Sequence, residues 1–529
     1  MRYQLSTVDL DQTPPSISIP REYNAAYDLI GRNLDSGRGD RIAYIDDNEE
    51  ITFSELDVKT TRIGSGLTKM GLSQEQRLFL CVVDSIDWPA AFLGAIKAGI
   101  VPIAANTLLT PDDYRYMLED SRAKVAVISP HFIDVFTPLL KEVETLESLI
   151  IAGDSDGSFT RLSAVESSGD PGFVGPATTA DDPCFWLYSS GSTGSPKGTV
   201  HIHSSMMYTA ALFAQGVLKL TEEDRVFSAA KLFFAYGLGN ALSFPLSCGA
   251  STVLMAERPT PDAVFKRLID HQPTLFCGVP TLYAAMLASS DMPGEKDLNL
   301  RISTSAGEAL PEDLLSRWTT KVGSGIVDGI GSTEMLHIYL SNAIDDIQAG
   351  STGKPVPGYD IKLVDADGAE VPQGEIGDLV VKGPSSAIMY WNKRQKSVDT
   401  FKGEWTHSGD KFSVNEAGYY VYAGRTDDML KVSGIYVSPA EVEATLVKHP
   451  SVLEAAVVGA NDENQLIKPK AYLVLNKGFE GNEALSQELK DFIKENLAPH
   501  KYPRWFVYVE DLPKTATGKI QRFKLRELD

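Results

Sequence analysis

Short apolar runs alternate with amphipathic segments along most of this 529-residue chain. The segments 54–70 and 261–272 repeat apolar residues at helical spacing, which predicts helices with one buried face. Strands are predicted at Leu78–Val83, Val125–Ile128, Leu149–Ala152, Val226–Ala229, Thr252–Met255 and Thr274–Cys277. These strands are apolar throughout, which is typical of sheets covered by helices on both faces. We therefore predict an α/β fold.

A second, smaller domain is predicted after Gly424. The segment 418–423 has the pattern of a closing strand, and the charged stretch 425–432 follows it. Ser438-Pro439-Ala440-Glu441 predicts a helix that begins with a capping box. Further strands are expected at 453–459, 471–475 and 505–510, a helix at 482–497, and an exposed loop at 512–522. We predict a large N-terminal domain of several subdomains, residues 1–424, with sheets flanked by helices, and a small α+β C-terminal domain, residues 425–529.

Composition narrows the classes of function. The chain carries 49 Lys and Arg against 71 Asp and Glu, a net charge of -22, which argues against partners such as nucleic acid or an anionic membrane surface. The four cysteines are far apart, as expected of free thiols in a reducing cytoplasm. The uncharged stretch 232–256 is interrupted by glycines and Pro245, which favours a buried segment over a membrane span. We expect a soluble, cytoplasmic protein.

A motif rich in glycine and hydroxyl groups, YSSGSTGSPKG, occupies residues 188–198. Glycines let backbone N–H groups turn toward an anion, hydroxyls add donors, and Lys197 adds positive charge. Pro196 precedes Lys197, so the spacing is not that of a Walker loop. Composition alone would fit a flexible linker better, but the position directly after an apolar strand favours a phosphate-binding loop. Its candidate nucleotide contacts are Ser189, Ser190, Gly191, Ser192, Thr193, Gly194 and Lys197.

The motif resembles the phosphate loop of the adenylate-forming superfamily of acyl- and aryl-CoA ligases. Further superfamily motifs follow in the expected order: SAGEALP (305–311), VDGIGSTEM (327–335), WTHSGD (405–410), YAGRTDDMLKVSG (422–434) and PKTATGK (513–519). Three more segments, 230–242, 257–267 and 332–338, are similar to those of the benzoate–CoA ligases. The resemblance spans nearly the whole chain and implies an ATP-dependent aryl-CoA ligase.

The resemblance implies ATP, Mg²⁺ and CoA as cofactor and cosubstrates. Transfer of AMP to a carboxylate brings an anion to a polyanion, so positive charge must gather at the α-phosphate. The implied catalytic residues are Lys519, Lys197 and Glu334, and Glu334 is also the implied magnesium ligand. Asp410 is the implied acceptor of the ribose hydroxyls, and Arg425 supplies donors beside it. The other implied ATP contacts are Gly307, Glu308, Ala309, Asp328, Gly329, Ile330 and Thr333.

Lys519 lies in the small domain, so the resemblance implies that this domain is mobile and closes to deliver the lysine. Asp427 matches the hinge position, and Gly434 matches the glycine that lines the CoA tunnel. A catalytic lysine on an accessible loop is also a candidate for a lysine acetyltransferase and deacetylase, because acetylation removes its charge. A homodimer is compatible with the sequence, which carries no signature of oligomeric state.

The acyl pocket is expected where the resemblance to benzoate–CoA ligases is strongest. Its small residues would leave a slot, and the Tyr236 ring could stack on a planar acid. Ordinary core packing is the alternative for each residue, and His337 is interpreted as a ring-edge contact rather than a proton carrier. The implied lining residues are Phe234, Ala235, Tyr236, Ala306, Gly331, His337 and Ile338.

Three other functions stay open at this stage. The acid could be a hydroxy- or aminobenzoate, which differs from benzoate by one small group. The adenylate could be loaded onto a separate carrier protein instead of CoA. A catalytically silent nucleotide-binding regulator ranks last, because Lys519, Glu334 and the phosphate loop are all present.

Overall fold

The computed structural model of the chain describes residues 4–155, 157–191, 194–426, 428–432, 435–463, 466–497, 501–514 and 520–528. The chain forms two compact units: Met1–Ile361 with Val381–Thr406, and Lys362–Val380 with His407–Asp529. The expected boundary after Gly424 therefore falls inside the second unit, and a hinge there stays a prediction. Each unit is described by itself below.

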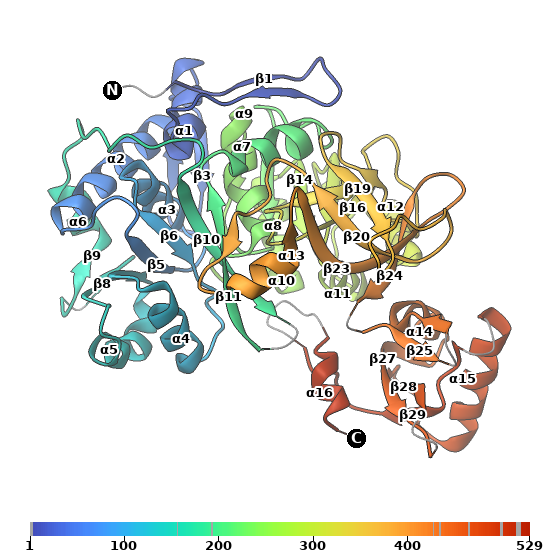
Figure 1. Cartoon of the computed structure of the whole chain (residues 1–529). Coiled ribbons are helices and arrows are strands. Elements are labelled where there is room, and N and C mark those ends of the chain that lie inside the picture. Colours follow the sequence, from blue (N-terminus) through green and yellow to red (C-terminus); the bar gives the residue numbers. More distant parts are fainter. Residues whose placement is uncertain are drawn as a thin grey trace. The chain divides into compact units, whose positions relative to one another are not determined.

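The first unit contains an eight-stranded sheet in the order β21-β11-β10-β6-β5-β7-β8-β9 (Figure 1). The strands from β10 to β9 are parallel, and β11 and β21 are antiparallel to their neighbours. The bounds are β5 Arg77–Cys81, β6 Val101–Ala104, β7 Val125–Ile128, β8 Ser148–Ile151, β9 Thr160–Arg161, β10 Pro183–Gly191, β11 Gly194–Ile202 and β21 Met389–Tyr390.

Helices cover both faces of this sheet, as the continuous apolar strands predicted. Along β5, Leu78 and Leu80 join one core cluster, whereas Phe79 and Cys81 join the cluster on the opposite face. Figure 1 shows α1, α2, α3 and α6 on one side of the sheet and α4 and α5 on the other. These helices span α1 Ala25–Asp35, α2 Phe53–Lys69, α3 Asp87–Lys97, α4 Pro111–Ser121, α5 Ile133–Glu142 and α6 Leu162–Ser168.

A nine-stranded sheet in the order β18-β17-β16-β15-β14-β12-β13-β3-β4 forms the other half of the first unit. One face packs on a core in which Tyr283 and Trp318 meet edge to face, 4.6 Å between ring centroids. Its strands are β3 Ile42–Ile45, β4 Glu50–Thr52, β12 Arg225–Ser228, β13 Ser251–Val253, β14 Leu275–Gly278, β15 Ile302–Ser305, β16 Ile326–Gly331, β17 Ile338–Ser341 and β18 Lys354–Pro355. Helices α10 Pro261–His271, α11 Pro280–Ala288 and α12 Glu312–Val322 belong to this half.

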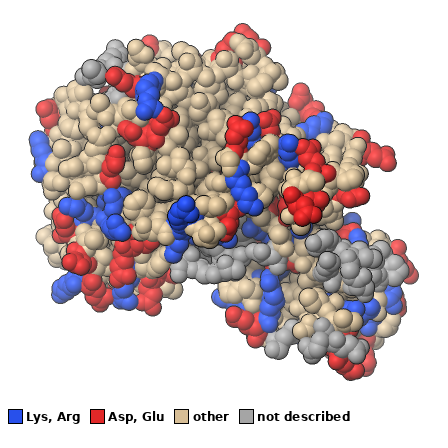
Figure 2. All heavy atoms as spheres, in the orientation of Figure 1, with Lys and Arg blue, Asp and Glu red and all other residues tan. Residues whose placement is uncertain are grey.

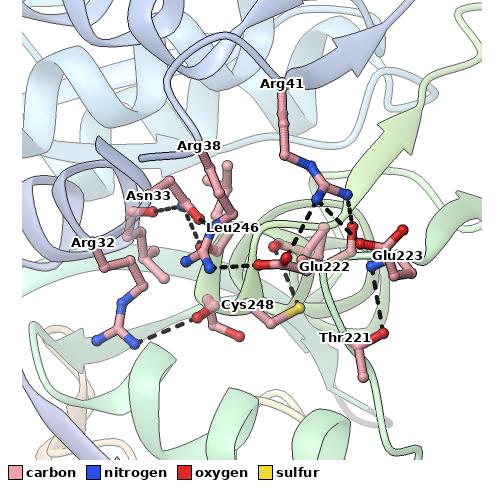
Figure 3. Close-up of polar contacts among 12 residues, drawn as sticks. Arg32, Asn33, Arg38, Arg41, Thr221, Glu222, Glu223, Leu246 and Cys248 are labelled. Atoms are coloured by element: carbon pink, nitrogen blue, oxygen red, sulfur yellow. Dashed lines mark hydrogen bonds and ion pairs between the residues drawn. The ribbon is translucent and has the colours of Figure 1, made fainter. Parts of the chain in front are cut away.

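An ion-pair cluster ties the end of α1 to the segment that precedes β12 (Figure 3). Arg38 Nη1 lies 2.7 Å from Glu222 Oε2, and Arg41 Nη1 lies 3.2 Å from Glu223 Oε1. Asn33 donates to the Leu246 carbonyl at 2.7 Å. Ion pairs near the surface stabilise a fold by at most about 1 kcal/mol each. We therefore assign to this cluster a structural role, which is to align these two segments, and no catalytic role.

The uncharged stretch 232–256 is buried inside the first unit, which confirms the prediction. It forms α8 Ala235–Leu238, the π-helical η3 Gly239–Ser243, α9 Phe244–Cys248 and then β13. Gly249 ends α9 at a φ of +90°, a conformation that favours glycine. Among the described residues, no helix has the length and apolar character needed to cross a membrane. Acidic and basic side chains lie interspersed on the face drawn in Figure 2.

The second unit ends in a small α+β layer. Its three-stranded sheet has the order β27-β28-β29, antiparallel and then parallel. Leu446, Val457 and Leu489 belong to its core. Strands β23 and β24 precede this layer in a separate sheet, and β25 and β26 pair with each other. The elements from β23 onward are β23 Trp405–Val414, β24 Tyr420–Arg425, β25 Leu430–Val432, β26 Ile435–Val437, α14 Pro439–Leu446, β27 Val452–Asn461, β28 Ile467–Leu475, α15 Glu483–Asn496, β29 Trp505–Tyr508 and α16 Arg522–Arg526.

Two local predictions for this unit need correction. The Ser438 hydroxyl accepts from the Glu441 N–H at 3.1 Å, but the Glu441 carboxylate bonds to Lys501 Nζ at 2.6 and 2.7 Å instead of closing a capping box. The expected exposed loop 512–522 is anchored at its described ends. Leu512 is 2% exposed, and Lys514 Nζ lies 2.7 Å from Glu454 Oε2. Burial of Leu512 and the ion pair of Lys514 thus hold the start of this segment, and residues 515–519 lie outside the described residues.

Candidate active site

The phosphate motif lies on a β-hairpin. Strands β10 and β11 pair so that Ser189 faces Lys197 and Gly191 faces Gly194. A loop was predicted over the whole motif, but cross-strand pairing holds most of it in the sheet. The Ser189 hydroxyl is buried and has no hydrogen-bond partner among the described residues, so it is available to a ligand. Ser192 and Thr193 lie outside the described residues, as does the side chain of Ser190, and Gly191 and Gly194 are described by their backbone pairing alone.

Glu334 lies in the turn that joins β16 to β17. Leu336 adopts a φ of +67°, and its N–H donates to the Thr333 carbonyl at 3.2 Å, which closes the turn. His201 of β11 donates from Nε2 to the same carbonyl at 2.8 Å. Burial lowers the pKa of His201 to about 4, so this histidine is neutral near pH 7. The turn that carries Glu334 is therefore fixed to the phosphate hairpin.

Lys197 and Glu334 form the charged centre of the first unit. Lys197 Nζ lies 3.9 Å from Glu334 Oε1, and the two side chains are 15% and 16% exposed. Tyr390 of β21 donates its hydroxyl to the same Oε1 at 2.6 Å, and Lys197 Nζ lies 4.3 Å from the Tyr390 ring centroid. Tyr390 and His201 could not be predicted from the sequence, because no spacing relates either residue to Glu334.

Six of the expected ATP contacts lie on or directly after two neighbouring parallel strands. The turn Gly307–Ala309 follows β15, and Asp328, Gly329 and Ile330 belong to β16. Gly307 has a φ of +95°, which favours glycine at this turn. The carboxyl ends of parallel strands form the usual ligand-binding edge of an α/β sheet. The structure thus brings these two predicted segments together.

Asp328 is a buried acid at this edge. It pairs in register with Ser305, and neither Asp328 Oδ1 nor the Ser305 hydroxyl has a hydrogen-bond partner among the described residues. Burial raises the pKa of the Asp328 carboxyl well above its ordinary value, and the Ser305 hydroxyl lowers it by a smaller amount. Burial therefore disfavours the charged form of the Asp328 carboxyl.

His337 lies in an aromatic group with Tyr236, which was also expected in the acyl pocket, and with Phe244, which was not. The Tyr236 hydroxyl hydrogen-bonds to Thr304 Oγ1 at 2.7 Å, and the His337 ring lies 5.5 Å from Tyr236 and 4.4 Å from Phe244. His337 Nε2 donates to the Tyr236 carbonyl at 3.2 Å, and burial lowers the pKa of His337 to about 3. A neutral, enclosed histidine supports its interpretation as a contact residue.

The structure itself requires a small residue at position 331 of the expected acyl pocket. At Gly331 a Cβ atom would lie 2.5 Å from the His337 carbonyl oxygen and 2.8 Å from the Ile338 nitrogen. Glycine at 331 is therefore required by the close approach of β16 to the start of β17, whether or not it also lines a slot. Ala306 and Ile338 are 5% and 1% exposed, whereas Phe234, Ala235 and Tyr236 are half-buried.

Asp410 and Arg425 lie opposite each other on β23 and β24 of the second unit. Arg425 Nη1 lies 3.0 Å from Asp410 Oδ1 and also donates to the Ser408 carbonyl at 3.2 Å. At Gly409, which has a φ of +75°, a Cβ atom would lie 2.8 Å from Arg425 Nη2. The predicted carboxylate and its donor fork are thus adjacent. Lys519, Asp427 and Gly434 lie outside the described residues, so their roles stay predictions.

The side chains fit a magnesium ion that is held mainly by nucleotide phosphates. The described residues contain no group of three or more His, Cys, Asp or Glu side chains that could hold a metal alone. Glu334 is a single carboxylate beside the phosphate hairpin, and Mg²⁺ usually binds one or two carboxylates together with phosphate oxygens.

A lysine-bearing phosphate hairpin, a nearby carboxylate and a ligand edge on a parallel sheet define the class as adenylate-forming enzymes. Two family models match the chain: AMP-binding enzyme over residues 33–391, and AMP-binding enzyme C-terminal domain over residues 441–519. The chain therefore belongs to the AMP-binding enzyme family, and within it to the acid–thiol ligases, which use ATP, Mg²⁺ and CoA.

Three relatives place the chain within this family. It is 60% identical to a benzoate–CoA ligase of Thauera aromatica over 526 residues, an alignment that covers 99% of each chain. It is 48% identical over 510 residues to a 4-hydroxybenzoate–CoA/benzoate–CoA ligase of Rhodopseudomonas palustris, 96% of this chain and 94% of the other. The crystal structure of a benzoate CoA ligase from Burkholderia xenovorans LB400 matches with a TM-score of 0.89 and 52% identity, over 95% of this chain and 100% of that one.

Proposed function

We propose that this chain is a benzoate–CoA ligase, which converts benzoate, ATP and CoA to benzoyl-CoA, AMP and diphosphate. The observation that carries the proposal is 60% identity over 99% of the chain to an enzyme with this activity. The aromatic group around His337 supports it. A planar acid can pack on the Tyr236 ring, and such ring pairs contribute about 0.5–1.5 kcal/mol beyond area burial.

In the first half-reaction, a benzoate oxygen attacks the α-phosphorus of ATP and the bond to diphosphate breaks. Lys197 and the Ser189 hydroxyl contact phosphate oxygens from the hairpin, and Asp410 accepts hydrogen bonds from the ribose hydroxyls. Glu334 would hold Mg²⁺, which neutralises phosphate charge. Lys519 would bridge the benzoate carboxylate and the α-phosphate when the C-terminal domain closes.

In the second half-reaction, the sulfur of CoA attacks the carbonyl carbon of the enzyme-bound benzoyl-adenylate. The thiol proton goes to solvent and AMP leaves. Gly434 would line the path of the thiol arm, where a larger side chain would block it. Domain alternation about Asp427 would exchange Lys519 for Gly434 at the site, so that one site performs both half-reactions.

A second candidate substrate is 4-hydroxybenzoate. The Rhodopseudomonas palustris relative is named for both acids, and His337 Nδ1 is buried with no hydrogen-bond partner among the described residues. A neutral imidazole nitrogen of this kind can accept a hydrogen bond from a hydroxyl. The ratio of kcat/KM for the two acids separates the candidates.

Three further features are proposed. The four cysteines are free, and three are buried, which supports a reducing cytoplasmic location. A homodimer is compatible with the sequence, and the resemblance supports regulation of Lys519 by an acetyltransferase and a deacetylase. Light scattering of the purified enzyme and mass spectrometry of Lys519 test these two proposals.

The proposed function is tested by AMP formation from ATP and CoA across a panel of acids. The panel contains benzoate, the hydroxybenzoates, 2-aminobenzoate, cinnamate and a medium-chain fatty acid. We expect the highest kcat/KM for benzoate and AMP release that requires CoA. A preference for the fatty acid would contradict the substrate, and AMP release that requires a carrier protein rather than CoA would contradict the acceptor.

A further inference from the structure

Tyr390 contacts both charged groups of the phosphate site with two different parts of its side chain. Its hydroxyl donates to Glu334 Oε1 at 2.6 Å, and its ring face lies 4.3 Å from Lys197 Nζ. Tyr390 itself is 3% exposed, so both contacts are shielded from water. A tyrosine placed in this way can hold an anion and a cation at the same time.

The separation of Lys197 and Glu334 is unusual for a pair with so little exposure. Charge-assisted hydrogen bonds between an ammonium and a carboxylate normally measure about 2.7–2.9 Å, whereas Lys197 Nζ is 3.9 Å from Glu334 Oε1. The carboxylate oxygen nearest the lysine already accepts the Tyr390 hydroxyl. The ammonium is attracted to the ring face by the cation–π interaction. Each charge is therefore held by Tyr390 rather than by direct hydrogen bonding to the other.

We infer that Tyr390 is a positioning residue that sets the separation of Lys197 and Glu334. At this separation Lys197 can contact phosphate oxygens while Glu334 contacts the magnesium ion that accompanies them. This inference rests on the proposed function, because it concerns the binding of magnesium-bound ATP. Without the tyrosine hydroxyl, the two charges would close on each other, and nucleotide binding would first have to separate them.

The backbone around Tyr390 is bonded to both elements that it serves. Residue 390 pairs with Thr199 of β11, two residues beyond Lys197. The Trp391 N–H donates to the Gly198 carbonyl at 2.8 Å, and the Ala387 N–H donates to the Glu334 carbonyl at 2.7 Å. The segment 387–391 thus links the phosphate hairpin to the Glu334 turn, which fixes the place of the tyrosine ring relative to both charges.

Two substitutions separate the two contacts. Tyr390→Phe removes the hydroxyl bond to Glu334 and keeps the ring, whereas Tyr390→Leu removes both. We expect Tyr390→Phe to weaken binding of α,β-methylene-ATP about tenfold in the presence of magnesium, and Tyr390→Leu to weaken it further. Because the hydroxyl acts through Glu334, Tyr390→Phe should have no additional effect in a Glu334→Gln background.

Isothermal titration calorimetry of the full chain with α,β-methylene-ATP tests the inference without turnover. Titrations are performed with saturating magnesium and with excess EDTA, and the tyrosine effect is expected to be larger with magnesium, because Glu334 is then needed as well as Lys197. Tyr114→Phe is the matched control, because it also removes one buried hydroxyl, which donates to the Asn106 carbonyl at 2.9 Å and lies on helix α4. Thermal unfolding of each variant identifies any general loss of stability.

The possible results separate the inference from the proposed function. Wild-type affinity for Tyr390→Phe in magnesium, or an equal loss in the Glu334→Gln background, would overturn the role of Tyr390 and leave the proposed function intact. A wild-type enzyme that binds no analogue under either condition would overturn the proposed function, and this inference with it. A magnesium-dependent loss that vanishes in the Glu334→Gln background supports the inference.

Discussion

Gly239 lies against the His337 ring, and a methyl group added there should disturb the expected acyl pocket. In Gly239→Ala the new Cβ would lie 2.7 Å from His337 Nε2 and 2.9 Å from Phe244 Cζ. Both distances are far shorter than van der Waals contact, so the His337 ring must move. Overpacking of this kind typically costs about 1–3 kcal/mol.

Gly31→Ala in helix α1 is the matched control. Its Cβ would have one neighbour, Leu5 Cδ2, at the ordinary contact distance of 3.7 Å. Replacing glycine by alanine in a helix is itself favourable by about 0.5–1 kcal/mol, and this gain is common to both variants. The free energy of unfolding of Gly239→Ala should therefore be about 1–3 kcal/mol below that of Gly31→Ala.

Urea unfolding gives the stability difference, and steady-state kinetics shows whether the pocket is affected. We expect the KM for benzoate to rise about tenfold in Gly239→Ala, with an unchanged KM for ATP, because a change of 1.4 kcal/mol corresponds to tenfold. Gly31→Ala should keep both wild-type values. The reasoning is refuted if Gly239→Ala matches Gly31→Ala in both unfolding free energy and benzoate KM.

Two further predictions concern buried or paired carboxylates. Burial raises the pKa of Asp84, which accepts a hydrogen bond from the Leu232 N–H, to about 6. Folding therefore favours the protonated carboxyl, and the stability that this form contributes is fully present below pH 3.8 and is lost as the pH rises through 6. Asp84→Asn should gain about 3 kcal/mol relative to wild type between pH 4 and pH 8, and a pH-independent difference in urea unfolding would contradict this. Asp410→Asn should weaken AMP binding about tenfold or more, measured as the Kd from calorimetry. Asp378→Asn is the control, because it loses a 2.9 Å ion pair with Lys411 and should leave this Kd unchanged. Equal losses of AMP affinity in the two variants would argue against a ribose contact of Asp410.

Much of the fold could be predicted from the sequence because its strands are apolar on both faces. Val125–Ile128 was predicted to the residue, and the segment 226–229 within one residue, since burial on both sides leaves little else such runs can form. The phosphate hairpin could not be predicted in the same way. Glycine and serine have low strand propensity, and only pairing with a neighbouring strand holds residues 188–191 extended.

The site residues that belong to sequence motifs could be predicted. The site residues that only strand pairing brings to the site could not. Lys197 and Glu334 belong to recognisable motifs, and the structure brings them together. Tyr390 reaches Glu334 only because β21 joins the sheet beside β11, a pairing that no local pattern specifies. The burial of Asp328 could not be predicted from the sequence either, since it depends on how the neighbouring strand and turn pack over this residue.

The central claim is that Lys519 of the C-terminal domain takes part in adenylation and is not needed for thioester formation. The most direct measurement compares ATP–diphosphate exchange with conversion of supplied benzoyl-adenylate and CoA, in wild type and Lys519→Ala. We predict that the variant loses exchange and retains conversion of the adenylate. Exchange at a rate near that of wild type in Lys519→Ala would contradict the account.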